Sequence, residues 1–486
     1  MWNIGSKEKW SLVFTTFIIS LTIIILIWLK DPIRSWYRAA RLTLQLKGPP
    51  GLPLLGNISI VKDPSEIFRL GQIAYKEYGS VAKGWLSIIP IIGVLEPKYL
   101  NIILSSSKLS DKNFLYSFMH TFLGDGLITG NGNKSKLHRR YISLYFKINY
   151  LEQFISTFNE SANRMVEQLK GKDEVKITTF INRCVLNILH QAIMGIPMQE
   201  QEIINNSPFS KGQMSLIQRV LQPWLLLSFF YKFTNRSRLE LDQKSTIMGF
   251  SREVLEKRRS DKEAHKDLDW CLLDGLIEIS ETKHDFNDKD IVDEVCTFML
   301  AGQDSVGSAI AFTLYQLAKH EHIQNKVIEE ITKTISSSSI TLDQLNEMNY
   351  LEKCIYESMR ICPSVPLIAR KLCEDVNLGE YVLPKGCNLF ISPLATHRSP
   401  QHFPEPEIFD PERFSSKIDS CAYIPFSAGP RDCLGKRFAM LEMKTIISRF
   451  LQNYKISLIP GKEKLEPHYR VTLRAKGGIP LKLEIR

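Results

Sequence analysis

The chain has 486 residues, of which 44% are hydrophobic and 23% are charged. These fractions are ordinary for a globular protein, and they exclude a disordered chain and a small disulfide-stapled one. The formal net charge of +10 favours anionic partners such as lipid headgroups or an acidic protein. The sequence shows neither zinc-finger spacing nor a basic region with heptads, so we expect no nucleic-acid partner.

The first predicted element is a membrane anchor within residues 1–30. Trp10 to Leu29 carries no charge, and as a helix it would be about 30 Å long, the thickness of the hydrocarbon core of a bilayer. More basic residues follow this span than precede it, which places the rest of the chain on the cytoplasmic side. The alternative is a cleaved signal peptide, which would have a shorter apolar core and a small-residue cleavage site.

Residues 31–56 are basic and rich in proline, and they are predicted to form a stiff hinge. Lys47 to Pro53 contains three prolines and two glycines, which cannot continue a helix. Residues 57–486 then form the body.

The body is predicted to be mainly α-helical with small β-sheets, an α+β fold. Ser80 to Val94 and Cys387 to Pro393 are strand candidates, whereas 290–335 shows helical spacing of apolar residues. Near the C-terminus, alternating apolar residues on both sides of Gly477-Gly478 predict a β-hairpin. Leu221 to Phe233 is strongly apolar, and it fits a core helix and a segment dipping into the bilayer equally well.

Nine cysteines are scattered along the chain without a Cys-x-x-Cys pair, which favours free thiols over disulfides. Cys433 differs from the others because it directly precedes an amphipathic helix predicted at Lys436 to Leu451. The start of a helix stabilises a thiolate through its dipole and free N–H groups. Arg431 beside it suits a carboxylate, and Gly429 and Gly435 allow the backbone to approach a flat group.

A soft anionic sulfur next to a carboxylate-binding arginine is what an iron porphyrin needs. The alternative for a lone cysteine is a structural buried residue. The segment from Phe426 to Gly435 reads F-x-x-G-x-R-x-C-x-G, and it resembles the haem-binding signature of the cytochrome P450 family. The resemblance implies that Cys433 ligates iron and that Phe426, Gly429, Arg431 and Gly435 contact the haem.

Two further strings are weak alone but are similar to motifs of the same family. Gly302 to Ser305, within the predicted long helix, resembles the oxygen-activation string, with serine in place of threonine. Gly302 would leave room for dioxygen and substrate, while Asp304 and Ser305 would relay protons. Their alternative is an ordinary stretch of a helix. Glu357 and Arg360 lie three residues apart and can pair on a helix. The resemblance adds Arg413 to that pair in a structural network.

The resemblance also implies that Arg370 and Arg139 bind the haem propionates. Ser135 lies where the family usually has a tryptophan, four residues before Arg139. Three strings look most like family four, the fatty-acid ω-hydroxylase clan: Glu294 to Leu300, Pro223 to Leu225, and Cys421 to Pro425. Many members of the clan have a glutamate at the position of Ala301, where it can form an ester to the haem. We therefore expect haem b without such a bond.

The resemblance implies a cytochrome P450 fold and a haem-thiolate monooxygenase of the endoplasmic reticulum membrane, with its body on the cytoplasmic side. It would use O2 and electrons from NADPH through a flavoprotein reductase, with cytochrome b5 as a further candidate partner. The substrate would be apolar: a fatty acid, another lipid, an isoprenoid hormone or a xenobiotic. Two alternatives are a haem-thiolate isomerase or dehydratase that needs no oxygen, and a non-catalytic haem-binding membrane protein.

Overall fold

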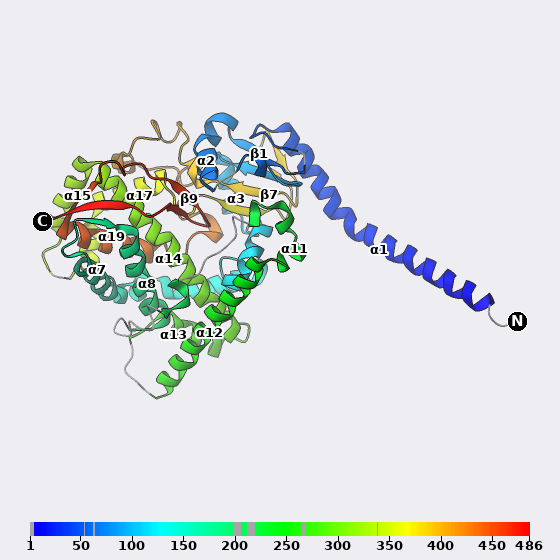
Figure 1. Ribbon diagram of the computed structural model, residues 1–486, viewed down its shortest axis with the longest axis horizontal. Helices are drawn as coiled ribbons and strands as arrows, with labels where there is room; N and C mark the ends of the chain where they lie inside the picture. Colours follow the sequence, from blue (N-terminus) through cyan, green and yellow to red (C-terminus); the bar gives the residue numbers. More distant parts are fainter. Residues whose placement is uncertain are drawn as a thin grey trace.

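The computed structural model describes residues 4–52, 54–61, 64–197, 206–210, 219–264, 269–337 and 339–486. A mainly helical body carries small β-sheets toward one side, and a long helix projects from it (Figure 1). The helices are α1 (Ile4–Gln45), α2 (Pro64–Tyr78), α3 (Pro97–Ser105), α4 (His120–Leu123), α5 (Gly132–Ile142), α6 (Ile148–Leu151), α7 (Ile155–Leu169), α8 (Ile177–Met194), α11 (Ser228–Lys232), α12 (Asn235–Glu263), α13 (Leu272–Thr282), α14 (Asp288–Lys319), α15 (Glu321–Thr334), α16 (Leu342–Glu347), α17 (Asn349–Ile361), α18 (Pro393–Thr396) and α19 (Lys436–Asn453). The predicted α+β class of the body, mainly helical with small sheets, is confirmed.

The strands are β1 (Val81–Leu86), β2 (Ile89–Val94), β3 (Glu174–Lys176), β4 (Ile368–Lys371), β5 (Val376–Asn377), β6 (Val382–Leu383), β7 (Asn388–Ile391), β8 (Tyr454–Leu458), β9 (Pro467–Tyr469), β10 (Leu473–Ala475) and β11 (Pro480–Ile485). One sheet has the order β1-β2-β7-β4, in which β2 and β7 are parallel and the other neighbours are antiparallel. This sheet contains the two predicted strand segments Ser80 to Val94, which forms β1 and β2, and Cys387 to Pro393, which contains β7.

The predicted C-terminal hairpin is wrong. β10 pairs with β9, whereas β11 pairs with β8 and β3, so the two strands that flank Gly477-Gly478 belong to different sheets. Both glycines have positive φ, 77° and 85°, and the chain does turn there. Alternation of apolar residues shows that a strand has one buried face, but it does not identify the neighbouring strand.

The central helix is α14, which packs against α8, α12, α17 and α19. Within the part of the chain that the structure describes, it is the one helix long and apolar enough to cross a bilayer. However, 67% of its apolar window is buried in the body, as expected of a core helix. The helical spacing predicted over 290–335 is confirmed as two helices, which meet at His320, where φ is −121° and ψ is 76°.

Helix α1 contains the predicted anchor and continues through Pro32 into the segment predicted as a hinge. Side chains 14–22 and 29 of the anchor are exposed, and the side chains of 4–13 and 23–28 lie outside the described set. Its last turns are fastened to the body. Ser35 Oγ donates to the Lys385 carbonyl (2.6 Å), and Trp36 Nε1 donates to the Ile88 carbonyl (2.9 Å).

The apolar segment Leu221 to Phe233 is not a core helix. It forms a short 3-10 turn at Pro223–Leu226 followed by α11. Five of its large apolar side chains are exposed: Trp224, Leu227, Phe229, Phe230 and Phe233. The structure therefore excludes the core interpretation.

Candidate functional site

The loop that carries Cys433 folds back on itself directly before α19. The Cys433 N–H donates to the Phe426 carbonyl (2.8 Å), and the Asp432 N–H donates to the Gly429 carbonyl (3.0 Å). All nine cysteines of the chain are free, and only Cys373 and Cys433 are exposed. The predicted free thiols are confirmed, and Cys433 lies at the start of a helix as the sequence predicts.

The two glycines of this loop have different roles. Gly429 has a φ of 71°, and a Cβ atom there would lie 1.9 Å from the Leu104 carbonyl oxygen at the end of α3. Its lack of a side chain is thus explained by close packing of protein backbone, not by a flat ligand. At Gly435 the nearest atom to an added Cβ is Phe146 Cε1 at 3.8 Å, so this position leaves open space.

The Cys433 thiol is accessible, yet the surrounding protein raises its pKa to about 11 by desolvation. The Gly435 N–H, Arg139 and Lys436 lower this pKa, and Asp432 raises it. The start of the helix lowers the pKa of this thiol through the Gly435 N–H, as the sequence predicts, but desolvation has the larger effect. Metal coordination would have to displace the proton, which is the usual behaviour of a thiol ligand.

Three predicted arginines meet beside this loop with a lysine that the sequence did not single out. Arg370 is buried and Lys112 is half-buried, and desolvation lowers the pKa of both groups. The charges of Arg370, Arg431 and Arg139 lower the pKa of Lys112 further. Four mutually repelling cations fit a ligand that carries two carboxylates, as a porphyrin with its propionates does.

The arginines of this cluster donate hydrogen bonds mostly to uncharged acceptors. Arg431 donates to the Gly130 carbonyl (2.7 Å), the Leu127 carbonyl (3.3 Å) and the Ser135 hydroxyl. Arg370 Nη1 donates to the Ala369 carbonyl (3.0 Å). Arg139 is the exception, because it forms an ion pair with Asp432 and also donates to the Asp432 carbonyl (2.7 Å). The residue set fits a haem, and Ser135 gives Arg431 a hydrogen-bond partner.

Helix α14 carries Gly302, Asp304 and Ser305, which were predicted to make room for dioxygen and to relay protons. The contacts of these residues differ from that prediction. A Cβ atom at Gly302 would lie 2.8 Å from Leu189 Cδ2 of α8, so this glycine permits close packing of two helices. The Ser305 hydroxyl donates to the Ala301 carbonyl (2.8 Å). The Ser305 carbonyl accepts a hydrogen bond from the Ser364 hydroxyl (2.8 Å), so this turn is tied to the chain after α17.

Asp304 faces the C-terminal strands. Its carboxylate forms an ion pair with Arg474 of β10, and the Thr472 hydroxyl lies 3.4 Å from Oδ2. About a third of the Asp304 side chain is exposed, at 32%. Among the contacts of the described residues, no hydrogen bond joins Asp304 to the Ser305 hydroxyl, so the predicted relay is not closed in this conformation. The sequence missed Arg474 because it lies 170 residues away.

The predicted network of Glu357, Arg360 and Arg413 is confirmed. Arg360 Nε lies 2.7 Å from Glu357 Oε2, and both side chains are fully buried. Arg413 Nε lies 3.4 Å from Glu357 Oε1. Glu357 also accepts a hydrogen bond from the Asp410 N–H (3.0 Å), so this carboxylate joins α17 to the segment after Phe409.

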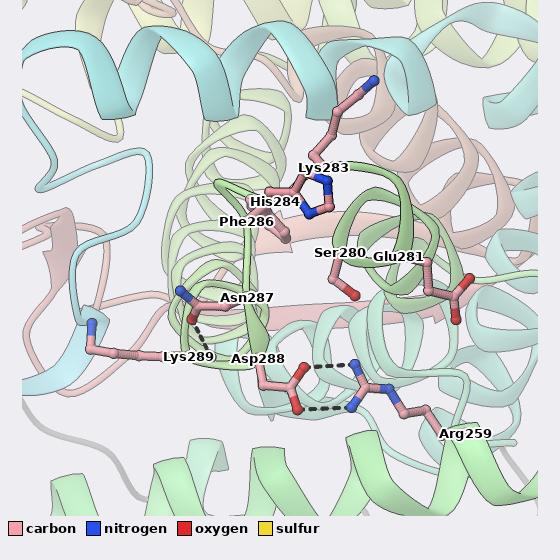
Figure 2. Close-up of a pocket in the computed structure, with 9 residues that line it drawn as sticks. All are labelled: Arg259, Ser280, Glu281, Lys283, His284, Phe286, Asn287, Asp288 and Lys289. Atoms are coloured by element: carbon pink, nitrogen blue, oxygen red, sulfur yellow. Dashed lines mark hydrogen bonds and ion pairs between the residues drawn. The ribbon is translucent and has the colours of Figure 1, made fainter.

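A polar surface pocket of about 540 Å³ lies where α12, α13 and α14 meet. Figure 2 shows Arg259 and Asp288 facing each other in a two-pronged contact across one side of it, with distances of 2.6 and 2.8 Å. The pairing raises the pKa of Arg259 and lowers that of Asp288. None of the lining residues was a predicted site residue, and most of them are charged or polar, so we do not propose this pocket as the substrate site.

The comparisons agree with the motifs. The family model described as Cytochrome P450 matches residues 46–481. "Probable cytochrome P450 4aa1" of Drosophila melanogaster is 44% identical over 469 residues, which cover 93% of this chain and 92% of that protein. "Cytochrome P450 4V2" of Mus musculus is 32% identical over 92% of this chain and 91% of that protein. "Cytochrome P450 4c3" of Drosophila melanogaster is 32% identical over 91% of this chain and 89% of that protein.

The family match spans the body from the end of α1 to β11, and it includes the Cys433 loop, α14 and the buried network on α17. These three relatives all carry family-four names, as the resemblance implied. The family carries a haem-thiolate cofactor, which agrees with the cation cluster beside an accessible cysteine. The chain therefore belongs to the cytochrome P450 family and is a monooxygenase, an oxidoreductase.

Proposed function

We propose that this cytochrome P450 is a membrane-attached monooxygenase that inserts one oxygen atom of O2 into an apolar substrate and draws two electrons from NADPH through a flavoprotein reductase. The second oxygen atom leaves as water, so each turnover consumes one O2, one NADPH and one proton. The observation that carries the proposal is the accessible Cys433 sulfur beside four buried or half-buried cations.

Cys433 would hold the haem iron, and the haem supplies oxygen activation when it is bound. Lys112, Arg139, Arg370 and Arg431 would neutralise its propionates, while Phe426 and Gly435 border the sulfur. Ala301 has no carboxylate that could form an ester, so the proposed haem b is held without one. The three arginines are already fixed by hydrogen bonds to the protein, so haem binding requires little reorganisation of their side chains.

The thiol pKa of about 11 predicts how Cys433 reacts in haem-depleted protein. Only the thiolate is nucleophilic, so alkylation of Cys433 by iodoacetamide should speed up about tenfold per pH unit from about pH 7 to about pH 10. Site-resolved mass spectrometry measures this rate, with the exposed Cys373 as an internal reference. A plateau already near neutral pH would show that the protein ionises the sulfur without iron.

Proton supply is proposed for Asp304 and Ser305. The partly exposed Asp304 carboxylate can take up a proton from water, and the Ser305 hydroxyl can pass one toward the oxygen side of the site. Arg474 and Thr472 hold the Asp304 carboxylate in one orientation against β10. Arg474 would therefore set the position from which the acid starts.

Replacing Arg474 by methionine should uncouple NADPH use from product formation. A partly exposed ion pair contributes up to about 1 kcal/mol, so we expect up to about fivefold less product per NADPH, with the difference released as peroxide. The matched control is Lys476→Met, which removes an exposed partner of Glu466; this pair lies just beyond the ends of β10 and β9. Equal coupling in both variants would contradict the proposed role of Arg474.

Membrane attachment is proposed from two exposed apolar features. Helix α1 carries an uncharged exposed stretch, and α11 with its flanks presents five large apolar side chains. In Figure 1, α11 and the base of α1 lie on the same side of the body. Exposed apolar patches of this kind mark membrane or protein contacts. We infer a location in the endoplasmic reticulum membrane with the body on the cytoplasmic side.

A basic surface beside Cys433 is the proposed docking site for an acidic reductase, and cytochrome b5 would compete for it. Lys436 and Arg437 of α19 are exposed, as are Lys136 and Arg140 of α5. Reversing Arg437 to glutamate should slow reduction by the reductase about tenfold at low salt, and the effect should shrink at high salt. Lys482→Glu, an exposed reversal on β11, is the control; equal slowing would exclude a specific surface.

The proposed function is tested with membranes from cells that produce the chain. After a carbonate wash the protein should stay in the membrane pellet, and with added reductase it should oxidise a lipid substrate only when NADPH and O2 are both present. Release into the supernatant would contradict the anchor. Turnover without oxygen would favour an isomerase or dehydratase, and absence of turnover with every lipid tried would favour a non-catalytic haem protein.

A further inference from the structure

We propose that Glu294 and His138 are positioning residues for the Cys433 loop, acting through the loop formed by Gly124–Gly130. The inference rests on the proposed function for the role of Cys433 as iron ligand. Neither residue belongs to the proposed haem or proton-delivery groups, yet both are buried and charged or titratable, with exposed fractions of 0% for Glu294 and 2% for His138.

The 124–130 loop is bound tightly to α14. The Leu127 N–H donates to Glu294 Oε2 (3.0 Å), and the Asp125 N–H donates to Asp293 Oδ2 (3.0 Å). A Cβ atom at Gly126 would lie 2.3 Å from the Thr297 hydroxyl oxygen, so the backbone lies directly against the helix. The loop therefore follows any displacement of this part of α14.

The opposite side of the same loop binds the Cys433 loop. Arg431, two residues before the cysteine, donates to the Leu127 carbonyl (3.3 Å) and to the Gly130 carbonyl (2.7 Å). The residue Leu127 thus binds Glu294 through its N–H and Arg431 through its carbonyl. A continuous path of hydrogen bonds joins the Glu294 carboxylate to the Cys433 loop through one residue.

A second path leaves the same carboxylate through α5. His138 Nδ1 lies 2.8 Å from Glu294 Oε1. The next residue, Arg139, donates to the Asp432 carbonyl (2.7 Å) and pairs with the Asp432 side chain. Both residues that directly precede Cys433 in the predicted haem-binding string, Arg431 and Asp432, are therefore reached from Glu294.

Burial raises the pKa of Glu294, and the contacts with His138 and Leu127 oppose that shift. The buried Glu294 carboxylate is thus stabilised by His138 and the Leu127 N–H, and not by contact with water. Gly302 and Ser305 follow on the same helix, eight and eleven residues later. The Glu294 side chain consequently links α14, which carries Gly302 and Ser305, to the loop that carries Cys433.

Hydrogen–deuterium exchange of the full-length protein tests the link with Glu294→Met, which removes both acceptor oxygens. We expect amides of 124–130 and of 426–435 to exchange about tenfold faster or more, the factor for one lost buried hydrogen bond to a charged group. Glu294→Gln keeps an acceptor for the Leu127 N–H and should restore slow exchange in most of 426–435. Unchanged exchange in 426–435 of Glu294→Met would overturn the proposal.

The matched control is Asp274→Leu, because Asp274 is also a buried carboxylate, with Arg258 Nη2 at 2.7 Å and the Cys271 N–H as its donors. Its loss should speed exchange near α13 and leave 426–435 unchanged. An equal effect at 426–435 would show general destabilisation and overturn the specific link. If Glu294→Met does not fold, His138→Phe removes the hydrogen bond to Glu294 Oε1, and unchanged exchange around Asp432 would overturn the positioning role of His138 and with it the proposal.

A spectroscopic readout separates this inference from the proposed function. In wild-type protein the reduced carbonyl complex should have a thiolate-type Soret band, and its absence would contradict the proposed function without affecting the exchange result. In Glu294→Met, a larger fraction of the reduced carbonyl complex should show the Soret band of a haem whose sulfur ligand is protonated or lost. In Glu294→Gln, the fraction with the thiolate-type band should return toward the wild-type value. A thiolate-type share equal to wild type in Glu294→Met would contradict positioning of Cys433.

Discussion

Replacing Cys433 by alanine should remove the thiolate-type spectrum and the monooxygenase turnover together. Loss of an outer-shell partner of a metal ligand typically costs about 10–100-fold in affinity or activity, and loss of the ligand itself should cost more. The measurement is a carbonyl difference spectrum of the reduced protein, followed by turnover with reductase, NADPH and a lipid substrate.

The control for this substitution is Cys373→Ala, because Cys373 is the other exposed cysteine of the chain. Its thiol donates to the Lys108 carbonyl (2.8 Å) and lies outside the predicted haem-binding string. We expect the spectrum and turnover of Cys373→Ala to match those of wild type. A pigment that persists unaltered in Cys433→Ala would overturn the assignment of the ligand.

Replacing Glu357 by alanine should prevent the protein from accumulating in a folded state. The substitution leaves the fully buried Arg360 without its carboxylate and takes a second contact from Arg413. An uncompensated buried charge costs about 3–5 kcal/mol, which is a large part of the stability of a typical protein. Thermal unfolding and the soluble yield of haem-containing protein measure the loss.

The chain provides a matched control in Glu66 and Arg69, which have the same spacing on α2 but lie at the surface, Arg69 exposed and Glu66 partly exposed. Exposed pairs contribute about 0–1 kcal/mol, so Glu66→Ala should unfold within a few degrees of wild type. Similar unfolding temperatures for Glu357→Ala and Glu66→Ala would show that the α17 network is not required for stability.

The parts of the site that the sequence predicted are those whose partners are close along the chain or carried by a family string. Glu357 and Arg360 are one helical turn apart, so their pairing follows from local geometry. Cys433 and Arg431 fall within ten residues, and the order of the strings identified the family. Helix α19 was predictable because its apolar spacing begins directly after the loop.

The parts that the sequence missed depend on contacts between distant segments. Lys112 has no motif around it and is recognised only because folding brings it to three arginines. Arg474 meets Asp304 across 170 residues, and His138 meets Glu294 across 156. Periodicity indicates which face of an element is buried, but it does not specify which side chain of another element lies opposite.

The attachment of α1 has a consequence for how the enzyme is oriented. Arg38 donates to the Asp375 carboxylate through Nη2 (2.7 Å) and Nη1 (3.2 Å). Ala39, Ala40 and Thr43 are buried against the body. Together with the Ser35 and Trp36 contacts, these contacts attach α1 rigidly to the body. Under the proposed membrane attachment, a bilayer that held the outer turns of α1 would also fix the tilt of the body, and apolar molecules diffusing within the bilayer would reach the body at one constant depth.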